Sequence, residues 1–311
     1  MTRHFLADDD LDAQEQESIL DLAARLKAER HLIQPLAGPQ AVAIIFDKPT
    51  LRTQLSFTTG VAELGGYPMV VDGNLAQIGT RESVADVARV VGRQVGAIVW
   101  RTHGQERIEE MAAHVDVPVV NALTDDYHPC QLLADLLTVR EHLGGTRGRS
   151  LTYVGDGGNN MAHSYLLAGT LAGMHVRIGT PSSHQPAADV VRRAEAIAAE
   201  QGGSVLVTDD PIEAVAGAHA VATDTWVSMG MEEEKAGRTG EASPFARYSL
   251  TRELLSHAAD EAIALHCLPA YRGLEIEAEV IDGPRSVVWD EAENRLHVQK
   301  AVLAFLLGAM P

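Results

Sequence analysis

The chain has 311 residues, of which 46% are hydrophobic and 22% charged, and its formal net charge is −18 at pH 7. This composition is typical of a globular protein, and the length allows two domains with their own cores. The acidic balance argues against a nucleic-acid partner, because binding a phosphate backbone needs a basic face.

No apolar run approaches the roughly 20 residues that a membrane span needs, and the N-terminus lacks a secretory leader. We therefore expect a cytoplasmic protein with no membrane partner. The two cysteines, Cys130 and Cys267, lie far apart in the sequence and form no metal-ligand pattern. In a reducing compartment a disulfide between them is not expected.

Helical and strand-like segments alternate along the chain. An amphipathic helix is expected over residues 10–29, and another over 132–142, which stops at a pair of glycines. β-Branched and apolar runs predict strands at 41–46, 69–71, 97–100, 117–121, 150–154, 175–178, 204–207, 220–223, 262–265 and 287–288. Helical patterns rich in Ala and Leu lie between most of them.

This alternation predicts an α/β fold with two doubly wound domains, each a parallel sheet flanked by helices. We expect the first domain over residues 1–145, completed by a C-terminal helix over 293–311, and the second over 146–292. The helix at 132–142 and the C-terminal helix would join the two domains.

Polar clusters follow six of the predicted strands. They are residues 50–53, Arg101, 128–131, 156–160, 224–230 and 266–269. Because ligands bind outside the carboxyl ends of strands in open parallel sheets, six clusters at corresponding positions are hard to explain as accident. The sequence therefore predicts a cleft to which both domains contribute.

The stretch 47–57 follows the strand at 41–46 through a proline turn and opens a helix. Thr50 and Thr53 carry hydroxyl donors, and Arg52 carries a planar fork that suits phosphate oxygens. A helix N-terminus also offers N–H groups and a positive dipole end. We interpret this stretch as an anion cradle; the alternative is a capped helix start with a surface arginine.

His128 and Gln131 lie on either side of Pro129, which fixes a turn before a helix. Both side chains can donate a hydrogen bond to a carbonyl oxygen that gains negative charge. The alternative is a loop histidine that caps the helix. Arg101 could serve the same oxygen or a phosphate, or lie on the surface.

Asn159 and Asn160 supply amides that suit a zwitterionic amino acid, or else they cap the next helix. Asp224 could hold an ammonium group near Ser228, or belong to an exposed loop. We expect Cys267 to contact an attacking amine rather than act as a nucleophile, because the adjacent His266 would point to the other face of the strand.

Taken in order, these pieces resemble the aspartate/ornithine carbamoyltransferase family, and the similarity runs over essentially the whole chain. The matching residues are Thr50, Leu51, Arg52, Thr53, Gln77, Arg101, Thr102, 128–131, Asn159, Asn160, Asp224, 228–230, 266–269 and Arg295. Asp224 with Ser-Met-Gly is the most specific signature of the ornithine branch, and His-Cys-Leu-Pro supports it.

The resemblance implies a homotrimer with active sites near its subunit interfaces. It implies transfer of the carbamoyl group of carbamoyl phosphate to the δ-amine of ornithine, giving citrulline and phosphate, with no cofactor and no metal. This is a step of arginine biosynthesis or of a urea-cycle type. Small molecules, carbamoyl phosphate and ornithine, would be the partners.

The resemblance also implies the site. Residues implied for carbamoyl phosphate are Thr50, Leu51, Arg52, Thr53, Gln77, Arg101, His128, Gln131, Cys267, Leu268 and Arg295, with Gln77 supplied by a neighbouring subunit. Residues implied for ornithine are Asn160, Asp224, Ser228 and Met229. Arg101, His128, Asp224 and Cys267 would be catalytic. From its sequence alone, Arg295 is either a cleft arginine or one on the surface of the last helix.

The phosphate loop departs from the family pattern Ser-Thr-Arg-Thr-Arg. Here Pro49 precedes Thr-Leu-Arg-Thr-Gln, so Leu51 lacks a hydroxyl and Gln54 lacks a positive charge. One charge-assisted hydrogen bond contributes roughly 1.5–3 kcal/mol, or about ten- to a hundredfold in affinity. This departure leaves two alternatives: a paralogue that carbamoylates another amine, and a catalytically weak binding or regulatory subunit.

Overall fold

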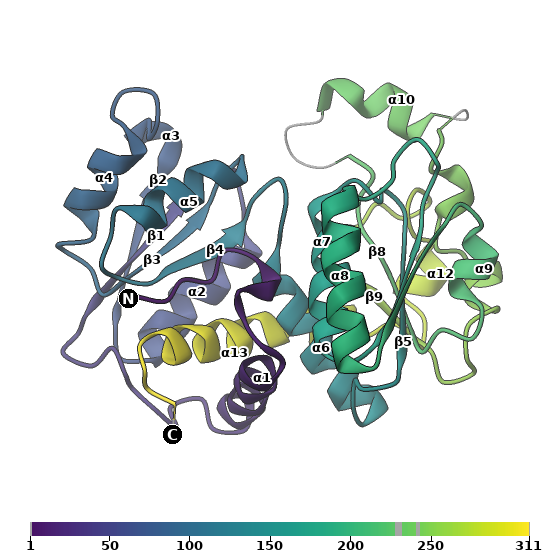
Figure 1. Cartoon of the computed structure of the whole chain (residues 1–311), viewed down its shortest axis with the longest axis horizontal. Helices are drawn as coiled ribbons and strands as arrows, with labels where there is room; N and C mark the ends of the chain where they lie inside the picture. Colours follow the sequence, from purple (N-terminus) through teal and green to yellow (C-terminus); the bar gives the residue numbers. More distant parts are fainter. Residues whose placement is uncertain (1, 228–231, 241–242, 311) are drawn as a thin grey trace. The chain divides into compact units, whose positions relative to one another are not determined.

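The computed structural model describes residues 2–227, 232–240 and 243–310, and the chain divides into two units. The first contains Met1–Leu137 and Glu293–Pro311, and the second contains Thr138–Ala292. The division falls within α6 (Pro129–Leu143). Helix α13 (Val288–Leu306), the yellow helix of Figure 1, begins in the second unit and runs into the first.

The first unit contains a parallel sheet of four strands in the order β2-β1-β3-β4. Its strands are β1 (Ala41–Phe46), β2 (Tyr67–Asp72), β3 (Ala97–Arg101) and β4 (Val119–Leu123). Central β1 and β3 are buried along almost their whole length, which explains their unbroken apolar sequences. Phe46 pairs with Arg101, so the two strands end together.

The helices of the first unit are α1 (Ala13–Ala28), α2 (Arg52–Glu63), α3 (Gly73–Ala76), α4 (Val84–Val91) and α5 (Gln105–Ala113). Helix α1 precedes β1, whereas the other four lie in the connections between successive strands, as expected for a doubly wound fold. Helix α1 begins later than the sequence predicted, because Asp12 and Glu15 form a capping box and residues Asp8–Asp10 form a separate 3-10 turn, η1.

The second unit contains a parallel sheet of five strands in the order β7-β6-β5-β8-β9. Its strands are β5 (Ser150–Val154), β6 (His175–Gly179), β7 (Ser204–Thr208), β8 (Ala220–Thr223) and β9 (Ile263–His266). Together the two sheets confirm the predicted α/β fold class. Thr223 pairs with His266, so β8 and β9 also end side by side.

Helices cover both faces of this second sheet. Figure 1 shows α7 (Asn160–Leu171) and α8 (Ala188–Gln201) on one face, with α9 (Pro211–Val215) and α12 (Ala278–Ile281) on the other. The shorter elements are η2 (Glu232–Glu234), α10 (Lys235–Thr239), η3 (Ala246–Tyr248) and α11 (Arg252–Leu255).

The strand predicted at 287–288 is wrong. Ser286 forms an isolated bridge with Ala264, and α13 begins at Val288, before the predicted start at residue 293. A pair of valines cannot separate a strand from the first turn of a buried helix, because both environments favour apolar side chains.

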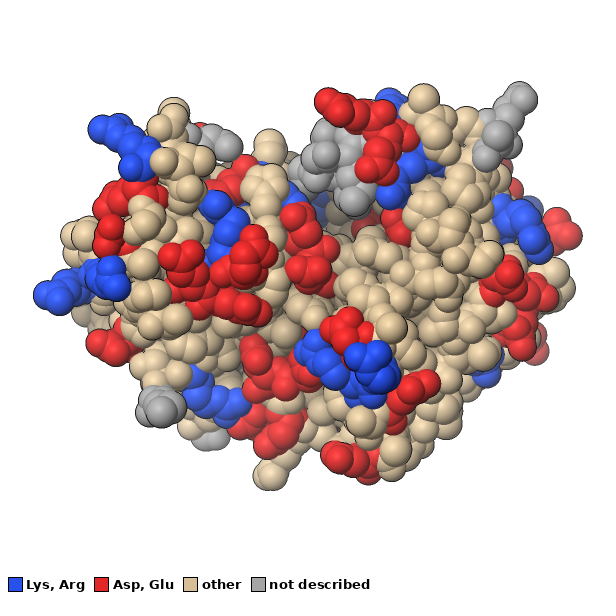
Figure 2. Space-filling view, turned by 45° about the horizontal axis from the view of Figure 1, so that its top comes forward, with Lys and Arg blue, Asp and Glu red and all other residues tan. Residues whose placement is uncertain are grey.

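Each helix in the described ranges is too short or too polar to span a bilayer. The surface agrees with the formal charge of −18. Figure 2 shows red acidic side chains spread over this face of the molecule, with blue basic side chains in smaller groups.

A buried ion pair attaches α13 to α2 in the first unit. The Lys300 ammonium donates to Glu63 Oε2 at 2.7 Å and to the carbonyl of Arg30, and its side chain is fully buried. The guanidinium of Arg30 also bonds Glu63. Although burial favours the protonated acid, the hydrogen bonds from Arg30 and Lys300 outweigh it and lower the pKa of Glu63.

Replacement of Lys300 should therefore destabilise the first unit. The change Lys300→Met leaves the Glu63 carboxylate with a half-exposed partner only, and breaking a buried pair in this way costs about 3–5 kcal/mol. Urea unfolding at a fixed protein concentration measures the loss. The double variant Lys300→Met with Glu63→Gln removes both charges and should lose less than the single variant; an equal or larger loss would contradict the argument.

Candidate active site

The phosphate loop predicted from the sequence lies between β1 and α2. Leu51 is the N-cap residue of α2 and supplies no side-chain acceptor, so the N–H groups of the first turn can face an anion. Thr50 and Arg52 are half-buried, whereas the Leu51 side chain is 67% exposed.

Arg295 comes from α13 and meets the phosphate loop. Its Nη2 donates to Thr53 Oγ1 at 2.7 Å, and both side chains are buried. Arg295 is therefore not a surface arginine, which excludes one of its two sequence-based interpretations. A hydrogen bond between residues so far apart in the chain brings the C-terminal helix to the start of α2.

Arg101 and His128 are buried polar residues that lie at the end of β3 and in the connection that follows β4. Arg101 is the last residue of β3, and His128 stands just before α6. Burial lowers the pKa of His128 well below its usual value, and the charges of Arg295 and Arg101 lower it further. The imidazole is thus neutral at neutral pH and keeps one N–H for donation to an oxygen.

The turn 128–131, expected as a loop, is largely helical. Helix α6 starts at Pro129, so Cys130 and Gln131 belong to its first turn. Proline is favoured at that position because its missing N–H has no intrahelical partner there. Gln131 is buried and its Nε2 donates to Asp135 Oδ1 at 2.8 Å. Burial raises the pKa of Cys130 to about 12, which leaves it an inert thiol.

Lys48 and Asp125 form an ion pair that the sequence did not predict. The Lys48 side chain is buried and connects the loop after β1 to the loop that leads to His128. The residues are 77 positions apart, so sequence spacing carries no signal for this contact.

Gln77 and Leu268 are the non-glycine residues of the described ranges whose φ is positive, at 52° and 58°. Such backbone conformations are uncommon for residues with a side chain and concentrate at functional sites. Gln77 is exposed and follows α3 in the first unit, whereas half-buried Leu268 follows β9 in the second. Both were predicted to bind carbamoyl phosphate.

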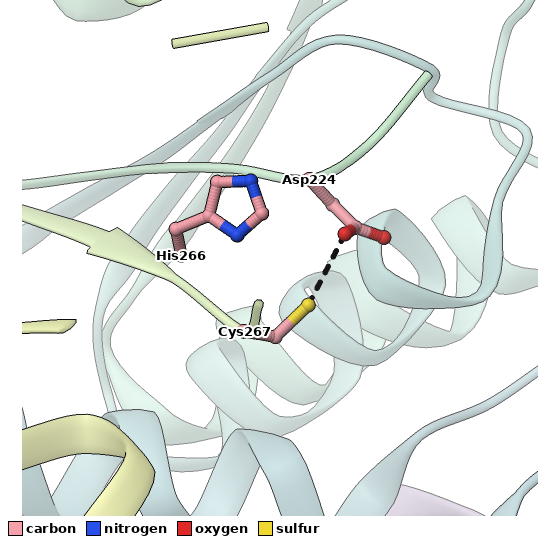
Figure 3. Close-up of side chains that lie close together, drawn as sticks. All are labelled: Asp224, His266 and Cys267. Carbon is pink, nitrogen blue, oxygen red and sulfur yellow. Dashed lines mark hydrogen bonds between the residues drawn. The ribbon is translucent and has the colours of Figure 1, made fainter. Parts of the chain in front are cut away.

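Asp224 and Cys267 meet at the ends of β8 and β9. Figure 3 shows the thiol of Cys267 directed at the carboxylate of Asp224, and the distance from Sγ to Oδ1 is 3.2 Å. The N–H of Thr225 also donates to Oδ1, at 2.7 Å. Burial raises the pKa of Asp224, although nearby His266 and the hydrogen bonds from Cys267 and Thr225 oppose the shift. A buried carboxylate with a raised pKa gains most from a bound cation.

His266 is part of the same cluster, and the ligand atoms of Asp224, His266 and Cys267 lie within 4.8 Å of one another. However, both ring nitrogens of His266 already have partners. Nδ1 accepts from the N–H of Leu268 at 2.9 Å, and Nε2 lies 3.1 Å from Glu275 Oε1. A metal ion would have to replace one of these buried bonds, so we interpret the cluster as a hydrogen-bonded group. The same bonds prevent His266 from deprotonating Cys267.

Asn159 and Asn160 differ in their roles. Asn159 caps α7, since its Oδ1 accepts from Ala162 N–H at 2.9 Å and its Nδ2 donates to the Tyr153 hydroxyl at 2.8 Å. Half-buried Asn160 is the first residue of α7. Ser228 and Met229, the other predicted ornithine contacts, lie outside the described residues.

Comparisons with known proteins agree over the full chain. The aspartate/ornithine carbamoyltransferase carbamoyl-P binding domain matches residues 3–141, and the Asp/Orn binding domain of that family matches residues 147–306. The chain belongs to the aspartate/ornithine carbamoyltransferase family. The predicted resemblance is thus confirmed.

Several members of this family are similar to this chain in sequence and in structure. Ornithine carbamoyltransferase of Clavibacter michiganensis subsp. michiganensis is 62% identical over 307 residues, covering 99% of each chain. The enzyme of that name from Renibacterium salmoninarum is 60% identical over 311 residues, again covering 99% of each. The solved ornithine carbamoyltransferase from Pyrococcus furiosus has a TM-score of 0.92 at 40% identity, covering 100% of this chain and 98% of that one.

The raised pKa of Asp224 gives a testable pH dependence. A carboxyl whose folded pKa exceeds its unfolded value stabilises the protein at low pH, and that contribution is lost as pH rises through the folded pKa. The substitution Asp224→Asn removes the titrating group and with it this decrease in stability at higher pH. The stability of the variant relative to the unmodified protein should therefore increase between pH 4.5 and pH 7.5, as measured by urea unfolding.

Asp86 provides a control whose titration lies outside this interval. Hydrogen bonds from Ser83 and Arg89 lower the pKa of this exposed carboxyl, so its contribution changes only at pH values near and below its usual range, and the relative stability of Asp86→Asn should stay constant between pH 4.5 and pH 7.5. If the two variants showed the same trend, the assignment of the Asp224 shift to burial would be wrong.

Proposed function

We propose that this chain is an ornithine carbamoyltransferase, which transfers the carbamoyl group of carbamoyl phosphate to the δ-amine of L-ornithine and releases citrulline and phosphate. The observation that carries the proposal is the contact between buried Asp224 and half-buried Cys267 at adjoining strand ends, in a chain 62% identical over 307 residues to a protein of that name. A cytoplasmic location and a role in arginine biosynthesis form part of this proposal.

The first unit would bind carbamoyl phosphate. The phosphate group of carbamoyl phosphate lies at the start of α2, where Thr50, Arg52 and the N–H of Leu51 face it. Arg101 supplies a second positive charge. Thr53, Arg101 and neutral His128 polarise the carbonyl oxygen. Hydrogen bonds to this oxygen strengthen as it becomes an oxyanion, and the neutral state of His128 preserves the donor that this needs. Gln131 and Leu268 hold the carbamoyl amide, and Arg295 supports the loop through Thr53.

The second unit would bind ornithine. The δ-ammonium lies against the Asp224 carboxylate, and the positive charge of the ammonium helps to keep the carboxylate ionised. The thiol of Cys267 fixes the orientation of the carboxylate. Asn160, Ser228 and Met229 contact the α-amino and α-carboxylate groups. Loss of one proton frees the lone pair of the δ-nitrogen for attack on the carbonyl carbon. The tetrahedral oxyanion then collapses and the bond to the phosphate oxygen breaks. The departing phosphate takes the second proton from the attacking nitrogen, and citrulline forms.

Exposed apolar side chains in the first unit support a homotrimer. Most of them lie at the start of α2, on edge strand β2 and two residues before Gln77: Leu51, Leu55, Tyr67, Met69, Val70 and Leu75, with Val90 on α4 as a further one. Exposed apolar side chains in this number favour an interaction surface. Burial of this surface against a second copy would also bring Gln77 to the phosphate site of the neighbouring subunit.

The alternatives raised by the atypical phosphate loop have no support. Curated relatives at 52% to 62% identity, matched along nearly their whole length, carry the ornithine carbamoyltransferase name. Asp224 and Cys267 of the amine side are intact and in contact. The altered residues Leu51 and Gln54 concern the affinity for carbamoyl phosphate and not the choice of amine.

A steady-state assay with carbamoyl phosphate and ornithine tests the proposal. The unmodified protein should form citrulline, and Gln54→Arg should lower the KM for carbamoyl phosphate, by about tenfold if one charge-assisted bond is regained. The KM for ornithine should stay the same in this variant. Absence of citrulline at high concentrations of both substrates, or a better rate with another amine, would overturn the proposed function.

Oligomer formation can be tested on strand β2. Val70→Asp places a charge among exposed apolar side chains, and it should convert a trimer to smaller species in light scattering with size-exclusion chromatography. Ile212→Asp is a matched control, because Ile212 is 50% exposed on α9 of the second unit. A Val70→Asp protein that keeps the mass of the unmodified protein would place the subunit interface elsewhere.

A further inference from the structure

Arg107 on α5 connects three segments of the first unit. Its Nε donates to Thr102 Oγ1 at 3.0 Å, and its Nη2 donates to Asp47 Oδ2 at 3.2 Å and to the carbonyl of Ile78 at 2.9 Å. The guanidinium also lies over the Trp100 ring, 5.2 Å from its centroid. One side chain therefore bonds the residue after β1, the residue after β3 and the loop after α3.

Asp47 is the centre of this network. It is buried, and its Oδ2 accepts from the Thr102 hydroxyl at 2.6 Å in addition to Arg107. Its backbone N–H bonds the carbonyl of Arg101 at 2.9 Å. Asp47 thus fixes the point at which the chain leaves β1 for the phosphate loop.

Gly73 and Gly79 allow the segment between them, which carries Gln77, to approach Asp47 and Arg107 closely. A Cβ atom at Gly73 would lie 1.8 Å from Asp47 Oδ1, and a Cβ atom at Gly79 would lie 2.6 Å from Arg107 Nη1. Gly79 also has a φ of +80°, which residues with side chains rarely adopt. Both ends of the segment that carries Gln77 are therefore in close contact with the Asp47–Arg107 pair.

Ile78 connects this network to Gln77. Ile78 directly follows Gln77, whose φ is 52°, and its carbonyl accepts the Arg107 bond. We infer that Arg107 is a positioning residue: it fixes the backbone that aims Gln77 and holds that backbone to Asp47 at the base of the phosphate loop. The inference rests on the proposed function, in which Gln77 contacts carbamoyl phosphate in a neighbouring subunit.

Arginine is suited to this task because its guanidinium is planar and its donors point in fixed directions. It can serve a carboxylate, a hydroxyl and a carbonyl at once. A lysine at 107 offers one ammonium on a flexible stem, so it cannot reproduce all three bonds. The charge of Arg107 also offsets that of buried Asp47.

A double-mutant cycle on Arg107 and Gln77 tests the inference. Arg107→Gln and Gln77→Ala should each raise the KM for carbamoyl phosphate by about tenfold, with the KM for ornithine changed less than twofold. Because Arg107 acts through Gln77, adding Arg107→Gln to Gln77→Ala should raise the KM by less than twofold more. Effects that multiply, or an unchanged KM in Arg107→Gln, would overturn the inference.

Two further variants make the result specific. Arg89→Gln is the matched control, since Arg89 is an exposed arginine paired with Asp86 on α4, and it should leave both KM values unchanged. Arg107→Lys keeps the charge beside Asp47, and it replaces Arg107→Gln in the cycle if the latter does not fold. Citrulline formation by the unmodified protein separates the two proposals: without it the proposed function fails, and with it only the role of Arg107 is in question.

Discussion

The pairing of parallel strands controls where the chemical groups of this protein lie. Phe46 pairs with Arg101, and Thr223 pairs with His266, so in each sheet two neighbouring strands end at the same level. The residue after β8 then faces the residue after β9, which is how Asp224 comes to contact Cys267. Apolar strands that need burial on both faces thus determine the distance between polar groups that the sequence separates widely.

Burial gives these polar groups their electrostatic character. Buried beside two arginines, His128 is a neutral donor, whereas buried Asp224 has a raised pKa and an affinity for cations. The two groups therefore favour opposite kinds of ligand: an oxygen that gains negative charge, and an amine that carries positive charge. Neither property needs an unusual residue type, because the environment supplies both.

The sequence predicted the strands well because each one is an apolar run bounded by turns, and it placed Asp224 and Cys267 at strand ends without predicting their contact, which the pairing of β8 with β9 provides. It failed at 287–288, where two valines start a helix, and at Pro129, which begins α6 instead of staying in a loop. It also missed Arg107, since the partners of that guanidinium lie on three separate segments. Tertiary contacts of this kind leave no local periodicity to detect.

Helix α13 has a consequence for the order in which the protein is built. It carries Arg295 to the phosphate loop and Lys300 to Glu63, yet the ribosome makes it after both sheets. Domains generally fold as units during synthesis, but the first unit, although its sheet emerges early, lacks these two cations until the second unit has been translated. A nascent chain therefore lacks the Lys300 partner of Glu63 and the Arg295 partner of Thr53 for most of its synthesis, which makes the completion of the phosphate site one of the last events in folding.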